Sequence, residues 1–197
     1  MTRRTPLSPA RTILSTLAAL GLVTTAAAGF ATSAQAAEAP GHGTVMADAS
    51  QAAARDAAAA NRQRLATRAA AEQNIRNTVV TKALAQVGDQ YGAGGDGPNV
   101  FDCSGLVVYA WRTVGVKLDH YSYAQYKQTE RISLRNAVPG DLAFYFRNGA
   151  HHVAIYIGDG KVVQAADYGI GVITGTVKGS PWTRAHFSGM GRVEIPG

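Results

Sequence analysis

The single cysteine of this chain, Cys103, is the residue best suited to covalent chemistry. It follows Asp102, a favourable helix N-cap, and precedes an apolar helical stretch that opens with Ser104 and Gly105. The positive end of a helix dipole stabilises a thiolate, so this placement predicts a lowered thiol pKa and a nucleophilic role. Two small residues also leave the first helical N–H groups open to hold an oxyanion. A buried apolar cysteine is the alternative, but a polar helix start behind a glycine-rich segment is a poor core position.

A thiol nucleophile needs a base, and two histidines, His151 and His152, begin a strand-like run. Alternation along a strand sends their side chains to opposite faces, so only one can meet the cysteine helix, and the pair does not form a metal chelate. His152 shares a face with Ala154 and Tyr156, and the small Ala154 leaves room for a packed helix. His151 fits a half-exposed strand edge. We therefore predict that His152 is the general base.

The base must in turn be oriented by a third group. A hairpin centred on Gly158 would place Gln164 of the next strand directly opposite His152, where its amide oxygen can accept the imidazole N–H. From spacing alone, however, the favoured interpretation is that Gln164 is an ordinary polar strand residue with no orienting role. Asp167 is a weaker candidate for the same orienting role.

The elements that must position these residues follow from apolar periodicity. Helical spacing over 79–87 and an apolar stripe over 104–114 predict two helices, each ended by a glycine. Helices followed by strands predict an α+β domain over 77–197 with a mostly antiparallel sheet. The strand-like runs are 142–146, 152–157, 161–165, 171–177 and 192–195.

The N-terminal part has the pattern of export and spacer sequence. Arg3 and Arg4 precede a short apolar run, and Ala34-Gln35-Ala36 has the form of a cleavage site, so residues 1–36 are predicted to be an export signal peptide. A general secretory signal is favoured over a twin-arginine signal. Residues 37–76 are predicted to hold a flexible linker, up to about residue 50, and an alanine-rich helical spacer. Wall or partner binding by that helix is the alternative.

Composition excludes several other classes of function. The chain has 19 Lys and Arg against 13 Asp and Glu, and three of the arginines fall within 1–36. The remaining excess of about three positive charges suits an acidic wall polymer and does not indicate nucleic-acid binding. One cysteine cannot form an internal disulfide or a thiolate zinc cluster, so we expect no metal and no cofactor. Beyond the signal, no run approaches the ~20 apolar residues of a membrane span.

Three motifs in this order resemble the NlpC/p-sixty family of secreted, papain-like cell-wall cysteine peptidases. They are Asp-Cys-Ser-Gly-Leu-Val at 102–107, Pro-Gly-Asp-Leu at 139–142 and His-Val-Ala-Ile-Tyr-Ile-Gly at 152–158. The similarity covers roughly 77–195. It implies a papain-like domain in which N-terminal helices pack on the sheet.

The resemblance also implies roles for individual residues. Cys103 aligns with the family nucleophile and His152, rather than His151, with its base. The third member, usually a histidine, falls on Gln164, which keeps an orienting role but removes any charge. The substrate-binding residues implied are Tyr91, Asp102 and Ser104.

The activity that the resemblance implies is hydrolysis of the bond between γ-D-glutamate and a diamino acid in peptidoglycan stem peptides, through a thioester. Two other functions stay open. One is a catalytically weak or inert wall- or partner-binding protein of the same fold. The uncharged Gln164 supports this alternative. The other is an amidase or acyltransferase of related architecture. We expect a secreted or wall-associated monomer that binds stem peptides, with a protein regulator as a conceivable further partner.

Overall fold

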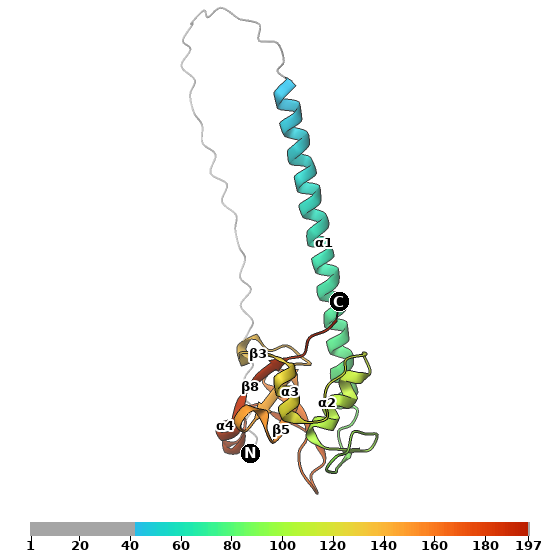
Figure 1. Cartoon of the computed structure of the whole chain (residues 1–197), viewed down its shortest axis with the longest axis vertical. Helices are drawn as coiled ribbons and strands as arrows, with labels where there is room; N and C mark the ends of the chain where they lie inside the picture. Colours follow the sequence, from blue (N-terminus) through green and yellow to red (C-terminus); the bar gives the residue numbers. More distant parts are fainter. Residues whose placement is uncertain (1–41, 197) are drawn as a thin grey trace, which may run out of the picture. The chain divides into compact units, whose positions relative to one another are not determined.

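The computed structural model describes residues 42–196, with side chains from residue 48 onward (Figure 1). The predicted signal peptide, 1–36, lies outside the described residues. Between residues 42 and 196 no helix is both long enough and apolar enough to cross a membrane.

The first element, α1 (His42–Leu84), is one long helix. Every side chain from 48 to 71 is exposed, because alanines and scattered charges provide no continuous apolar face. Near the helix C-terminus Val79 and Ala83 become fully buried in the core. Residues 42–50, expected within a flexible linker, are helical, and the expected domain start at 77 falls inside the same helix.

The packed domain is built on a six-stranded sheet in the order β3-β8-β4-β5-β6-β7, and all of its neighbouring strands are antiparallel. Four of the predicted strands appear with nearly the expected bounds. The fifth, at 192–195, is wrong: the strand lies earlier, in a glycine-containing segment whose pattern is weak by itself. The bounds are β3 (Glu130–Ile132), β4 (Leu142–Tyr145), β5 (His152–Gly158), β6 (Lys161–Ala165), β7 (Val172–Thr176) and β8 (Phe187–Arg192).

Short elements that the sequence pattern did not predict complete the domain. Helices of six or seven residues contain too few turns for apolar periodicity to show. The predicted helix at 104–114 is confirmed as α2 (Cys103–Arg112). The other elements are β1 (Gln90–Tyr91), β2 (Val100–Phe101), α3 (Ser122–Gln128), η1 (Leu134–Asn136), η2 (Arg147–Gly149) and α4 (Pro181–His186).

The hydrophobic core consists of two clusters, one on each face of the sheet. Leu106 and Trp111 of α2 pack in one cluster with Val153 and Ile155 of β5. Ala154 belongs to a second cluster, together with Tyr145 and Tyr156. The expectation that the cysteine helix packs over Ala154 is therefore wrong. The helix covers the opposite face, where β-branched side chains present a larger apolar surface.

The Pro-Gly-Asp-Leu motif has a structural role. Its aspartate, Asp141, is completely buried and pairs with Arg76 of α1 at 3.0 Å and with Arg192 of β8 at 2.9 Å. A buried carboxylate is tolerated only when such partners compensate it. This ion-pair network joins the end of α1 to the sheet. The prediction of an α+β domain with a mostly antiparallel sheet is confirmed.

Candidate active site

Cys103 is the first residue of α2, and Asp102 caps the helix as predicted. Asp102 Oδ1 accepts hydrogen bonds from the Gly105 N–H at 2.7 Å and from Ser104 Oγ at 3.0 Å. Its Oδ2 accepts from the Gly94 N–H at 2.8 Å. One carboxylate therefore joins the glycine-rich segment to the helix start and holds the backbone around the cysteine.

His120 is a fourth partner of this carboxylate that sequence reasoning missed. Its Nε2 lies 2.9 Å from both oxygens of Asp102. Burial alone would raise the pKa of Asp102, but hydrogen bonds from Gly105, His120 and Ser104 outweigh it and lower that pKa. We call Asp102, Gly94, Ser104, Gly105 and His120 the Asp102 cluster. A histidine at this spacing carries no sequence signal, because its contact depends on the path of the chain between α2 and α3.

Burial raises the pKa of the Cys103 thiol above its usual value, and the Asp102 carboxylate acts in the same direction. Backbone groups of Val153, Ser104 and Cys103 itself lower it in part. The expectation of a lowered thiol pKa is therefore wrong, because desolvation outweighs the helix N-terminus. Cys103 is mainly a neutral thiol at neutral pH and needs a base to become a nucleophile.

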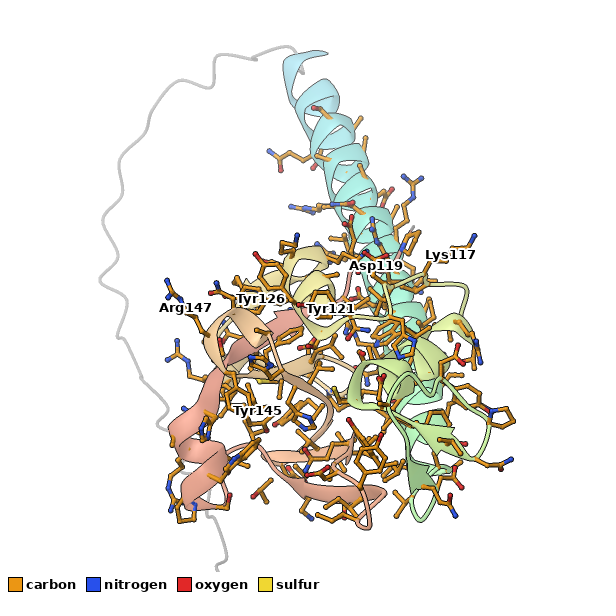
Figure 2. All side chains as sticks on the ribbon, turned by 60° about the horizontal axis from the view of Figure 1, so that its bottom comes forward. Lys117, Asp119, Tyr121, Tyr126, Tyr145 and Arg147 are labelled. Atoms are coloured by element: carbon orange, nitrogen blue, oxygen red, sulfur yellow. The ribbon has the colours of Figure 1, made fainter. Side chains whose placement is uncertain are left out.

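His152 is the buried histidine of the site, with 8% of its surface exposed. Its ring packs against Tyr145, at 5.5 Å between ring centres, and against Trp182, at 6.2 Å, and these two aromatic rings also contact each other at 5.9 Å (Tyr145 is labelled in Figure 2). Its Nε2 lies 2.7 Å from Gln164 Oε1. An amide oxygen only accepts hydrogen bonds, so Nε2 carries the proton and Nδ1 is left as the basic nitrogen.

The pKa of His152 is lowered, chiefly by burial, while the Gln164 hydrogen bond and the charge of Asp167 raise it in part. The ring is therefore neutral at pH 7 and able to take a proton. Asp167 Oδ1 accepts from the Tyr168 N–H at 2.7 Å rather than from the imidazole. Gln164, and not Asp167, is therefore the residue whose side chain is hydrogen-bonded to the ring.

The strand register differs from the expected one. Ile155 pairs with Val163 and Tyr156 with Val162, with an irregularity before Gly158. Gln164 is consequently diagonal to His152 instead of directly opposite, so that part of the prediction is wrong. The shift amounts to two positions, which keeps both side chains on one face, and the contact still forms.

Cys103 and His152 approach the site from different elements. The thiol lies beside the backbone of Val153, the residue after His152. α2 packs on the Val153 face of the sheet, whereas His152 belongs to the other face, so the thiol adjoins β5 one residue away from the histidine. Among residues 48–196, no hydrogen bond joins the thiol to the imidazole ring.

Tyr91 of β1 lies near the cysteine, as the resemblance implied. Burial is the largest cause of a raised pKa at Tyr91, and the nearby Cys103 and Asp102 act in the same direction. The Tyr91 O–H group therefore stays protonated. Tyr168 packs edge-on against it at 5.0 Å, and its hydroxyl accepts from the Ala93 N–H at 3.2 Å.

A groove of about 500 Å³ connects Tyr91 with His152 and the aromatic residues around it. A groove of this size accommodates a short peptide segment rather than a metal ion alone. Its lining residues are Tyr91, Phe146, His151, His152, Gln164, Ala166, Asp167, Ile170, Ser180, Trp182 and Thr183.

Curated proteins similar to this chain are named as endopeptidases. The probable endopeptidase p60 of Listeria monocytogenes is 40% identical over 116 residues, which cover 58% of this chain and 23% of that protein. The peptidoglycan endopeptidase RipA of Mycobacterium tuberculosis is 38% identical over 113 residues, covering 51% of this chain and 24% of RipA. The matched segment thus spans about a quarter of these relatives.

Solved structures show the same fold. The P60 domain of an antigen from M. avium subspecies paratuberculosis is 29% identical, with a TM-score of 0.56 over 64% of this chain and 98% of that one. A RipA structure with a substituted cysteine is 31% identical, with a TM-score of 0.56 over 64% of each chain. Two further RipA structures carry a substituted histidine and a substituted glutamate.

The model of the NlpC/P60 family matches residues 88–190, more than half of the chain. The matched range contains the cysteine, the histidine, the glutamine and the groove described above. The resemblance drawn from the three sequence motifs is confirmed, and the chain belongs to the NlpC/P60 family.

Proposed function

We propose that this chain is a peptidoglycan endopeptidase that cuts the stem-peptide bond between γ-D-glutamate and a diamino acid. Cys103 is the nucleophile, His152 its base and Gln164 the group that orients the base. The observation that carries the proposal is the 2.7 Å contact of His152 Nε2 with Gln164 Oε1, which leaves Nδ1 basic in a buried ring. The Cys103 thiol lies beside the backbone of Val153, the next residue along the chain.

The spacing of three residues supports these roles. The cysteine, histidine and glutamate substituted in the RipA structures are separated along that chain by 49 and 12 residues. Cys103, His152 and Gln164 have the same two separations here. The glutamate position holds a glutamine in this chain, which can accept the imidazole N–H but brings no negative charge.

The first chemical step is acylation of the cysteine. His152 takes the proton of the Cys103 thiol, and the thiolate attacks the carbonyl carbon of the scissile amide. The C–N bond then breaks as His152 returns the proton to the leaving amine, which leaves a thioester. Water activated by the same imidazole hydrolyses the thioester and releases the γ-D-glutamyl product.

The developing oxyanion meets hydrogen-bond donors in this site. The N–H groups of Cys103 and Ser104, at the start of α2, lie at the reacting sulfur, whereas that of Gly105 is taken by Asp102. Tyr91 adds an O–H donor, since its raised pKa keeps it protonated. Asp102 and Ser104 complete the proposed substrate-binding residues.

Peptidoglycan lies outside the cytoplasmic membrane, so the proposed activity requires export. We assign this step to residues 1–36, with 37–76 as a spacer and 77–197 as the peptidase domain. Export is supported by the basic start and apolar run of the N-terminal sequence. N-terminal sequencing of the protein recovered from culture medium or from washed cell walls tests it, and a chain that still begins at Met1 would contradict it.

The proposed activity is tested with purified stem peptides. The protein beginning at residue 37 and its Cys103→Ala variant are incubated with the peptides, and products are identified by mass spectrometry. Cleavage after D-glutamate by the wild type alone establishes both the enzyme and its bond. Absence of cleavage by a folded wild type, on peptides and on whole sacculi, refutes the proposal.

A binding protein of the same fold is the second candidate. The uncharged Gln164 and the raised thiol pKa of Cys103 both weaken base activation and favour this alternative. Calorimetric titration of stem peptides into the wild type distinguishes the two, since a pure binder would hold the intact peptide without converting it.

A further inference from the structure

The side chains that line the groove include a negative charge but no lysine or arginine. Asp167 is the only carboxylate among them. Asp167 is exposed, and no ion pair found within residues 48–196 includes it. A negative charge without a cationic partner beside a binding groove attracts positively charged groups of a ligand.

The local backbone presents this carboxylate to the groove. Asp167 Oδ1 accepts from the Tyr168 N–H at 2.7 Å, which restricts the side chain, and the segment is closed by the Gly171 N–H donating to the Asp167 carbonyl at 3.0 Å. Oδ2 has no hydrogen-bond partner in the described part of the chain and is available to a ligand.

Asp167 lies close to the chemistry. Its charge raises the pKa values of both His152 and Tyr91, which line the same groove. His152 must return a proton to the leaving amine, so the residue that bears this amine has to occupy the groove beside the imidazole. That part of the groove also contains Ile170 and Trp182, which are 58% and 46% exposed.

We propose that Asp167 is a specificity-determining residue that selects an ammonium group on the side chain of the leaving residue. This inference rests on the endopeptidase function proposed above. The methylene chain of a diamino acid packs along Ile170 and Trp182, and its terminal ammonium pairs with Asp167. The leaving residues favoured are those with a free side-chain amine.

The experiment compares two substrates that differ in one charge. The tripeptide L-Ala-γ-D-Glu-L-Lys and its Nε-acetyl-lysine form are hydrolysed by the protein beginning at residue 37, and kcat/KM is measured for each. We expect the wild type to prefer the free amine by about fivefold, the upper range for a solvent-exposed ion pair. Because Asp167 also acts on His152, the ratio of the two kcat/KM values is the readout, in which an effect on the base cancels.

Three variants extend the comparison. Asp167→Asn keeps the shape and hydrogen-bonding capacity of the side chain and is expected to bring the preference close to one. Asp159→Asn removes another exposed carboxylate, in the β5–β6 turn outside the groove, and is expected to keep the wild-type ratio. Asp167→Lys with Nε-succinyl-lysine as the third residue reverses the charges and is expected to favour the succinylated peptide.

The wild type alone provides a further measurement that does not depend on any variant folding. Raising the ionic strength to 1 M shortens the screening length to about 3 Å, so the preference for the free amine should largely disappear. Equal kcat/KM values for the two peptides at low salt, or a preference unchanged in Asp167→Asn, overturn the inference and leave the endopeptidase function standing. Failure of the wild type to cleave either peptide overturns both.

Discussion

The two sides of the active site are held in different ways. The nucleophile side, at the start of α2, is organised by polar contacts: the Asp102 carboxylate accepts from two backbone N–H groups and from the Ser104 hydroxyl, and also meets His120. The base side, at the start of β5, is organised by packing, with His152 against two aromatic rings and in contact with one amide. Hydrogen bonds thus hold the backbone around the thiol, whereas exclusion of water holds the imidazole and keeps it neutral.

This contrast has a consequence for the chemistry. Burial raises the thiol pKa on one side and lowers the imidazole pKa on the other, so each group is neutral before reaction. In the proposed mechanism, the thiolate–imidazolium pair therefore forms during the reaction instead of preceding it. The orientation of His152 by Gln164 therefore matters more than it would for a thiolate that is already formed.

The largest effect is expected on the nucleophile side. Cys103→Ala removes the attacking atom and should lower turnover of stem peptides by at least about 10⁴-fold. The thermal midpoint should change little, because the Asp102 cap does not use the sulfur. Turnover by Cys103→Ala close to that of the wild type would contradict the mechanism.

On the base side, Gln164→Ala should lower kcat by about tenfold to a hundredfold, part of the 10²–10⁴ that a positioned general base contributes. Gln164→Glu is the matched variant, since it keeps the acceptor and adds a charge that raises the pKa of His152. The acidic limb of the pH–rate profile should then move to higher pH. An unchanged rate in Gln164→Ala would mean that this residue does not orient the base.

A smaller effect is expected at the edge of the Asp102 cluster. His120→Ala removes one hydrogen bond to a carboxylate and should cost about 1 kcal/mol of stability, with a few-fold loss in kcat/KM. Lys117→Ala, an exposed change in the same segment (Figure 2), is the control and should behave like the wild type. Equal stability of the two variants in urea unfolding would show that the His120 contact contributes nothing.

The smallest effect concerns pH and stability. The folded-state pKa of His152 is below its ordinary value, so the unfolded chain binds more protons around pH 6 and the contribution of this residue to stability falls as the pH falls. That contribution is fully present above about pH 6.5, the unfolded value. The thermal midpoint should decrease by a few degrees between pH 7 and pH 5, and His152→Gln should reduce that decrease. If the thermal midpoints of the wild type and His152→Gln depend on pH in the same way, this prediction for His152 is wrong.

The nucleophile side was largely predictable from the sequence. An aspartate before a helix with small first-turn residues is a local capping signal, and the capping geometry needs only residues within three positions. The antiparallel β5–β6 hairpin, and with it the shared face of His152 and Gln164, also follows from local turn residues and alternation. The family resemblance required only these short motifs.

Tertiary structure decided the rest. The packing of α2 over Val153, the diagonal register of Gln164 and the contact of His120 with Asp102 depend on side chains far apart in the chain. The sign of the Cys103 pKa shift does so as well, because desolvation is a property of everything packed around a group, while the helix dipole is a property of its own segment. Residue types and spacing therefore determined which groups take part, and packing determined their protonation states and their geometry.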